Sequence, residues 1–183
     1  MKNKFLLLTW LLAVPLLWGG CDKPLFKPDR GSIAQPDELP PITTTGEGNF
    51  ACKINGVNWQ RCGGGFLQSS ILGNWSPNYK IFQISGMRRS CEGFDDSVNI
   101  TAYVDSAGIY ELHHAFYIDR NLSCQNITNP YSLLENADNW VEILNLDTEE
   151  YIVSGTFQCT LFDPNCGDTI YITDGRFDYD WAN

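Results

Sequence analysis

The segment Phe50-Ala51-Cys52-Lys53-Ile54-Asn55-Gly56-Val57-Asn58-Trp59 carries the clearest fold signal in the chain. Apolar residues alternate with polar or small ones on both sides of Asn55-Gly56, a pattern typical of half-buried β-strands. Asn and Gly tolerate the positive φ that both central residues of a tight hairpin turn require. The segment therefore predicts a β-hairpin with strands at residues 50–54 and 57–59.

Similar short strand patterns recur through the rest of the chain, and no long helical periodicity interrupts them. Further strands are expected at residues 66–72, 79–86, 98–104, 109–112, 140–146, 151–162, 169–173 and 176–179. Residues 119–139 are rich in Asn, Ser and Asp and are expected to form a loop, with room for a short helix at 130–136. Many short strands joined by turns predict an all-β fold, an antiparallel sandwich or barrel.

The N-terminal residues have the features of an export signal. A basic start at residues 1–4 precedes an almost purely apolar run of fourteen residues, Phe5–Trp18, and Gly19-Gly20 then leads to Cys21. A membrane-spanning helix needs about twenty residues, so we expect residues 1–20 to be a cleaved signal. Cys21 is the expected site of lipid (palmitate) attachment, as in the bacterial lipoproteins that this segment resembles. Plain secretion is the alternative, because Trp18 stands where a lipobox usually has leucine.

The remainder divides into a tether and one domain. Residues 21–49 begin with the lipidated Cys21 and continue with five prolines and few apolar side chains, which favours a disordered linker. Pairing of residues 42–45 as an edge strand is the alternative. Residues 50–183 are long enough for a single β domain with its own core. The expected location is the cell envelope of a Gram-negative bacterium, with the domain lipid-anchored at the outer membrane.

The charge balance restricts the possible partners. The formal net charge is −10, and removal of Lys2 and Lys4 with the signal would make it −12. An acidic chain repels phosphate backbones, so no nucleic-acid partner is expected. The sequence contains no G-x-S-x-G, phosphate-binding glycine loop or dinucleotide motif, and we expect no cofactor.

The seven cysteines suit an exported protein. With Cys21 lipidated, an even number remains, and this favours disulfides in an oxidising compartment. Cys159 and Cys166 flank a predicted turn and are the first expected pair. Cys62 with Cys91 is the second, because both border loops, and Cys52 with Cys124 is then left by elimination. A zinc site is less consistent with the sequence, which contains no C-x-x-C.

Two groups of residues are candidate ligand contacts. Trp75, in the turn-rich stretch 73–76, is the aromatic residue best placed to be exposed. The oxygen-bearing Asp174, Asp178 and Asp180 suit calcium, although a solvated strand edge explains them equally well. No metal is therefore assigned. No catalytic residue can be singled out, since a pair of carboxylates for glycoside cleavage could be drawn from many acids.

The motifs Cys52-x-x-Asn55-Gly56-x-x-Trp59, Ser154-Gly155-Thr156-Phe157 and Ile172-Thr173-Asp174-Gly175-Arg176-Phe177-Asp178 resemble a family of small bacterial lipoproteins with a domain of unknown function. The resemblance implies an envelope-anchored all-β domain, for which a calycin-like barrel is one of the expected architectures. It implies no enzymatic reaction. We therefore expect a non-catalytic binding or structural role, with the membrane contacted through the lipid. The expected partner is a glycan, a small apolar ligand or an envelope protein. The alternative is a carboxylate-dependent hydrolase acting on envelope or extracellular glycans.

Overall fold

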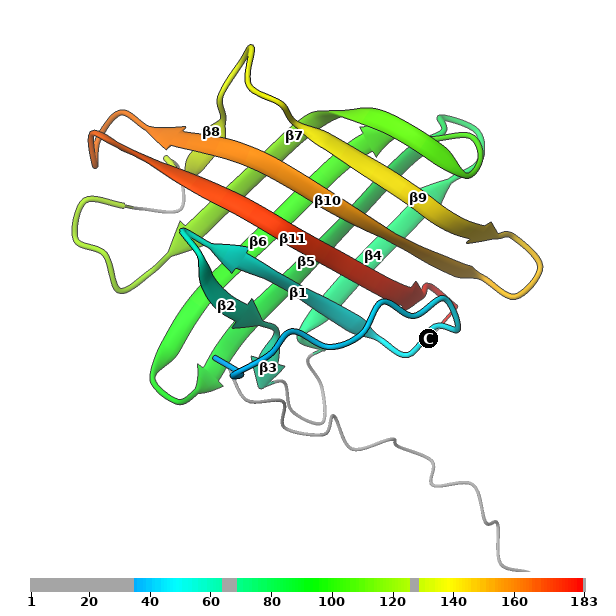
Figure 1. The fold of residues 1–183 in the computed structure, drawn as a ribbon, viewed down its shortest axis with the longest axis horizontal. Helices are drawn as coiled ribbons and strands as arrows, with labels where there is room; N and C mark the ends of the chain where they lie inside the picture. The colour runs from blue at the N-terminus through cyan, green and yellow to red at the C-terminus, as the bar shows by residue number, and fades with distance from the viewer. Residues whose placement is uncertain (1–34, 64–68, 126–128, 183) are drawn as a thin grey trace, which may run out of the picture. The chain divides into compact units, whose positions relative to one another are not determined.

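The computed structural model describes residues 35–63, 69–125 and 129–182, and regular structure in these ranges consists of β-strands (Figure 1). No helix among the described residues is long and apolar enough to cross a membrane. The all-β prediction is confirmed. The strands are β1 (Asn49–Ile54), β2 (Val57–Gln60), β3 (Cys62–Gly63), β4 (Ile71–Ser76), β5 (Ile81–Cys91), β6 (Phe94–Tyr103), β7 (Gly108–Asp119), β8 (Tyr131–Leu133), β9 (Trp140–Asp147), β10 (Ile152–Asp163) and β11 (Asp168–Asp180).

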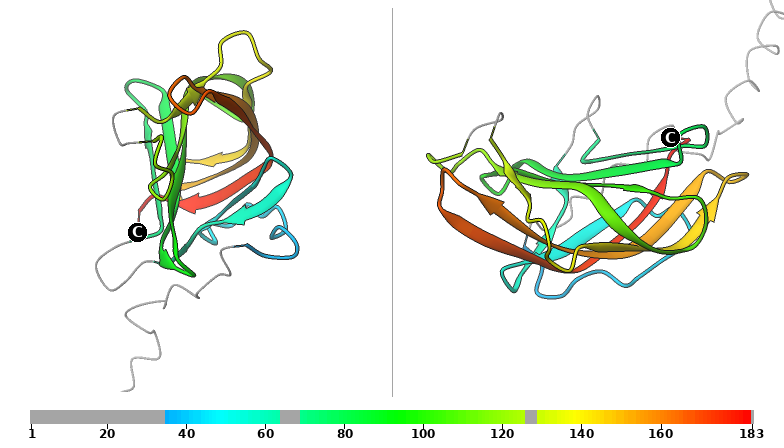
Figure 2. Two further views of the ribbon diagram at one scale, coloured as in Figure 1. Left: turned by 90° about the vertical axis from the view of Figure 1, so that its left-hand side faces the viewer. Right: turned by 90° about the horizontal axis from the view of Figure 1, so that it is seen from above.

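The strands form one sheet in the order β2-β1-β11-β10-β8-β7-β6-β5-β3, with β4 paired to β5. Every pairing is antiparallel except that of β3 with β5. Both β8 and β9 bridge β7 and β10, so the ladder closes on itself there, and the other strands extend from this small barrel. The sheet bends so that β5 and β6 lie opposite β1, β10 and β11 (Figure 2).

Aromatic rings fill the space between the two halves of the sheet. Phe50, Phe82, Phe157 and Phe177 are all fully buried. The rings of Phe82 and Phe177 stack with centroids 5.1 Å apart, and those of Phe50 and Phe157 lie 5.3 Å apart. Gly86 lies directly against the Phe50 ring, where a β-carbon would overlap it. These rings therefore occupy the interior that an open barrel would offer to a ligand.

The predicted hairpin at Asn55-Gly56 is confirmed. Ile54 pairs with Val57, and the two turn residues have φ of 51° and 81°. The loop expected over residues 119–139, with room for a short helix at 130–136, instead contains a strand, because residues 131–133 form β8. Ser132 pairs with both Phe116 and Phe162, so hydrogen bonding with strands distant in the sequence overrides the weak local preference.

The predicted disordered tether needs correction over residues 35–48, which we call the strap. The Asp178 carboxylate accepts hydrogen bonds from the backbone N–H groups of Thr45 (3.1 Å), Gly46 (2.7 Å) and Glu47 (3.1 Å). Arg176 also donates to the carbonyl of Pro40 at 2.8 Å. The strap (blue in Figure 1) thus lies against β11 without pairing as a strand. Residues 1–34, including the predicted signal, Cys21 and the rest of the tether, lie outside the described residues.

One predicted disulfide is confirmed. Parallel pairing of β3 with β5 aligns Cys62 with Arg88, and this brings Cys62 to Cys91 three residues further along β5. The two cysteines are joined, with Cα atoms 6.2 Å apart.

The other two predicted pairings are wrong. Cys166 is bonded to Cys124 instead, with Cα atoms 5.2 Å apart, while Cys52 and Cys159 are buried free thiols. Cys159 lies opposite Ile172, inside the sheet, whereas Cys166 belongs to the turn after Asp163. The loop after β7 folds back on itself through hydrogen bonds of Gln125, which allows Cys124 to reach that turn.

We predict that protein carrying Cys21→Ala, denatured without reductant, contains two reactive thiols, and that the native protein shows none. Burial raises the pKa of Cys159 to about 12; burial, and then the neighbouring Cys159, raise the pKa of Cys52 well above its usual value. Neither thiol therefore ionises at pH 7–9, where alkylation needs the thiolate. Counting alkylated cysteines by mass spectrometry measures this. Four or more reactive thiols would show that a disulfide is missing, and none would show that Cys52 and Cys159 are oxidised.

Candidate functional site

A tight turn between β5 and β6 places two opposite charges inside the sheet. Glu92 and Gly93 both have positive φ, 52° and 81°, as in the Asn55-Gly56 turn. Cys91 pairs with Phe94 beside this turn, and a register shift between Arg89 and Cys91 then sets Arg88 opposite Asp96. Both side chains face inward, where Arg88 is 7% and Asp96 1% exposed. A buried pair of this kind is tolerated only when hydrogen bonds satisfy its polar atoms.

Four hydrogen bonds converge on the Asp96 carboxylate. Arg88 donates from Nε at 2.7 Å and from Nη2, so the ion pair is bidentate. Trp59 on β2 donates from its indole Nε1 at 3.1 Å, and Tyr117 on β7 donates from its hydroxyl at 3.0 Å. Burial, and then the negative charge of Asp96, raise the pKa of Tyr117. The phenol therefore keeps its proton and remains a donor at neutral pH.

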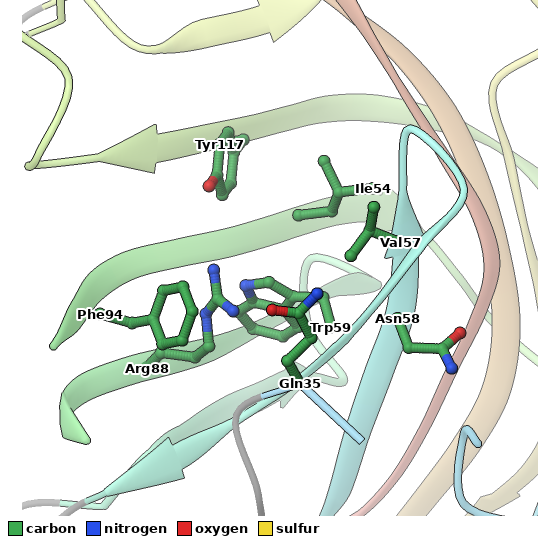
Figure 3. Close-up of a pocket in the computed structure, with 8 residues that line it drawn as sticks. All are labelled: Gln35, Ile54, Val57, Asn58, Trp59, Arg88, Phe94 and Tyr117. Carbon is green, nitrogen blue, oxygen red and sulfur yellow. The ribbon is translucent and has the colours of Figure 1, made fainter. Parts of the chain in front are cut away.

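The guanidinium of Arg88 also packs against aromatic rings. It lies 3.8 Å from the ring centroid of Phe94 and 5.5 Å from that of Trp59, within the range of cation–π attraction. Figure 3 shows the guanidinium between the two rings. Ion pair and rings together form a rigid group, which we call the Asp96 cluster: Trp59, Arg88, Phe94, Asp96 and Tyr117.

A pocket of about 190 Å³ lies over the Asp96 cluster (Figure 3). The β1–β2 hairpin supplies Ile54 and Val57, and the strap supplies Gln35. Asn58 fixes this end of the strap, because its amide donates to the carbonyls of Pro36 (3.0 Å) and Asp37 (2.7 Å). The pocket is lined by Gln35, Ile54, Val57, Asn58, Trp59, Arg88, Phe94 and Tyr117.

The pocket lining is largely apolar and carries no carboxylate among the described residues. Arg88 is its one formal charge, and Asp96 beneath it balances that charge. Its polar groups are the amides of Gln35 and Asn58 and the Tyr117 hydroxyl. Such a site, which is open on one side, can hold a small neutral group and orient it through one or two hydrogen bonds.

Trp75 does not occupy the exposed loop that was predicted. It lies in β4 and is partly buried, and its indole Nε1 donates to the carbonyl of Val104 at 3.1 Å. Its ring packs 6.1 Å from that of Trp181, which in turn lies 6.0 Å from Tyr151. Trp75 is absent from the pocket lining.

The structure does not assemble the three calcium candidates into a ligand set. Asp174 pairs with Lys53 at 2.8 Å, Asp178 holds the strap, and Asp180 accepts a hydrogen bond from the backbone of Ala182 at 2.9 Å. Over residues 35–63, 69–125 and 129–182, no group of three or more His, Cys, Asp or Glu side chains could hold a metal ion.

Asp163 and Asp168 are opposite each other across the β10–β11 hairpin, as Asp96 and Asp119 are across β6 and β7. Asp163 is fully buried and accepts a hydrogen bond from the backbone of Asn165 at 2.7 Å, while one of its oxygens has no hydrogen-bond partner. Asp168 accepts a hydrogen bond from the Tyr131 hydroxyl at 2.5 Å. None of these four carboxylates lines the described pocket.

Most of the pocket was missed by reasoning from the sequence, which identified Trp59 only as part of the β-hairpin and of the family motif. A partial signal was present: Arg88-Arg89 precede and Asp95-Asp96 follow the turn dipeptide Glu92-Gly93. A regular two-residue turn there would set Arg89 opposite Asp96. The observed pairing of Arg88 with Asp96 also needs the register shift between Arg89 and Cys91, which the sequence does not indicate. The contribution of Gln35 has no comparable signal, because it depends on where the strap docks.

Comparison with protein-family models, with curated proteins and with solved structures found no match for this chain. The resemblance to the lipoprotein family therefore stays a prediction.

We predict that Arg88→Met lowers the free energy of unfolding by about 3–5 kcal/mol, because it leaves the buried Asp96 charge without its cation. Arg120→Met is the matched control. Arg120 pairs with Asp95 at 2.9 Å, but the two side chains are 31% and 43% exposed, so the expected loss is about 0–1 kcal/mol. Urea unfolding followed by tryptophan fluorescence measures both variants. Equal losses would contradict the central role of the buried pair.

Proposed function

We propose that the protein is a lipid-anchored domain of the cell envelope with a non-catalytic binding role, and that the pocket over the Asp96 cluster is its binding site. The observation that carries the binding role is the preformed pocket. Its floor is held by four hydrogen bonds to one carboxylate, so little conformational freedom remains to be lost when a ligand binds. The proposed location depends on residues 1–21.

The filled interior supports a site at the end of the sheet. A barrel with an open mouth could carry an apolar ligand within it, but here Phe50, Phe82, Phe157 and Phe177 occupy that space. The described pocket lies instead between the β1–β2 hairpin, the β5–β6 turn and the strap.

The carboxylate-dependent hydrolase gains no support from the described geometry. Glycoside cleavage needs two carboxyl groups on either side of the scissile bond, and the described pocket lining includes none. Asp96 lies below the pocket floor, where it is 1% exposed and accepts four hydrogen bonds. A binding role is therefore the better supported of the two.

A panel of small probes tests the binding role without assuming a ligand. Neutral sugars, aromatic compounds, aliphatic alcohols, amines and carboxylates are added singly to ¹⁵N-labelled protein. At least one class should shift the backbone resonances of Val57 and Phe94 together with the Trp59 indole N–H. If no class moves these resonances together, the pocket is not a binding site.

The anchor has its own test. Cells expressing the full chain and fed a labelled fatty acid are expected to label the protein, and Cys21→Ala should abolish the label and release the protein from the membrane fraction. Cys52→Ala is the control and should keep the label, because that thiol is buried in the domain. Label retained by Cys21→Ala would refute the lipid anchor.

A further inference from the structure

We infer that the pocket binds one small neutral aromatic group with a hydrogen-bonding edge, such as a phenol or an indole. This inference rests on the proposed binding role and names the ligand class. The ring could belong to a free small molecule or to an exposed aromatic side chain of a peptide. Size, wall chemistry and charge each support the assignment.

The size of the pocket suits one ring. Its volume of about 190 Å³ corresponds to roughly six water molecules at ~30 Å³ each. Pockets for drug-sized ligands measure about 300–1,000 Å³, so a larger ligand would have only part of itself enclosed. A six-membered or fused ring with one small substituent matches this space.

The walls favour a ring that is apolar on both faces. Ile54, Val57 and Trp59 come from the β1–β2 hairpin, and Phe94 at the start of β6 contributes a second aromatic ring (Figure 3). A sugar would leave several hydroxyls facing these apolar side chains without partners, and each would cost free energy to bury. A phenol or an indole has a single polar group at the edge of its ring. The Gln35 amide offers that group both a donor and an acceptor.

The charges favour a neutral ligand. Asp96 holds the Arg88 guanidinium through a bidentate ion pair and so balances its charge. The chain as a whole carries a formal charge of −10. A carboxylate entering the pocket would lose its hydration without meeting an uncompensated cation. We therefore expect p-cresol and indole to bind, and their carboxylated analogues 4-hydroxyphenylacetate and indole-3-acetate to bind at least tenfold more weakly.

Titration calorimetry and NMR with p-cresol, indole and the two carboxylates test the inference on the full mature chain. Val57→Glu should weaken binding of p-cresol at least tenfold, because it places a charge in the wall. Ile42→Glu is the matched control and should change binding less than twofold, since Ile42 and Val57 are each 50% exposed but Ile42 does not line the pocket. Gln35→Ala should weaken p-cresol about threefold and leave toluene unchanged.

The source of the ring is tested with a short peptide carrying one central tyrosine and its alanine counterpart. Binding of the tyrosine peptide more tightly than p-cresol assigns the site to a protein partner, and weaker binding assigns it to a free small molecule. The inference is overturned if neither p-cresol nor indole binds at millimolar concentration, if the carboxylates bind equally well, or if Val57→Glu and Ile42→Glu have the same effect. Should sugars or amines shift the pocket resonances while aromatics do not, the ligand class is wrong but the binding role stands.

Discussion

The buried carboxylate of Asp96 is the constraint on which this end of the domain depends. A charge with 1% exposure is stable only if donors surround it, and its donors come from β2, β5 and β7. These strands are separated in the sheet order by β1, β11, β10, β8 and β6. An alternative packing or a slipped register would leave the carboxylate short of partners, so the cluster favours one arrangement of the fold over its competitors.

A second carboxylate acts in the same way on the outside of the sheet. Asp178 is also 1% exposed, and its donors are three backbone N–H groups of the strap. Bonds from N–H groups to a charged acceptor are stronger than those between neutral partners. At least two of the twenty-two acidic residues thus organise the fold, a role that the overall acidity of the chain conceals.

Reasoning from the sequence succeeded where the deciding interactions are local. The Asn55-Gly56 hairpin follows from two adjacent residues, and the all-β class follows from alternation within short segments. It failed where distant segments meet. The partner of Cys166 depends on how the loop after β7 folds, and β8 exists because β7 and β10 leave backbone groups for it to pair with. The pocket needs β1, β2, β5, β6, β7 and the strap at once, and no single segment carries that information.

The strap links the proposed binding site to the proposed lipid anchor at Cys21. Gln35 lines the pocket and follows Cys21 by fourteen positions in the sequence. A chain of that length spans at most about 50 Å, at ~3.6 Å per residue. If Cys21 carries a lipid, the pocket therefore lies within that distance of the membrane surface, and it remains there because Asn58 and Asp178 hold the strap to the domain. Ligands presented at that surface would meet the pocket at a higher local concentration than the same molecules free in solution, which makes even a small site useful.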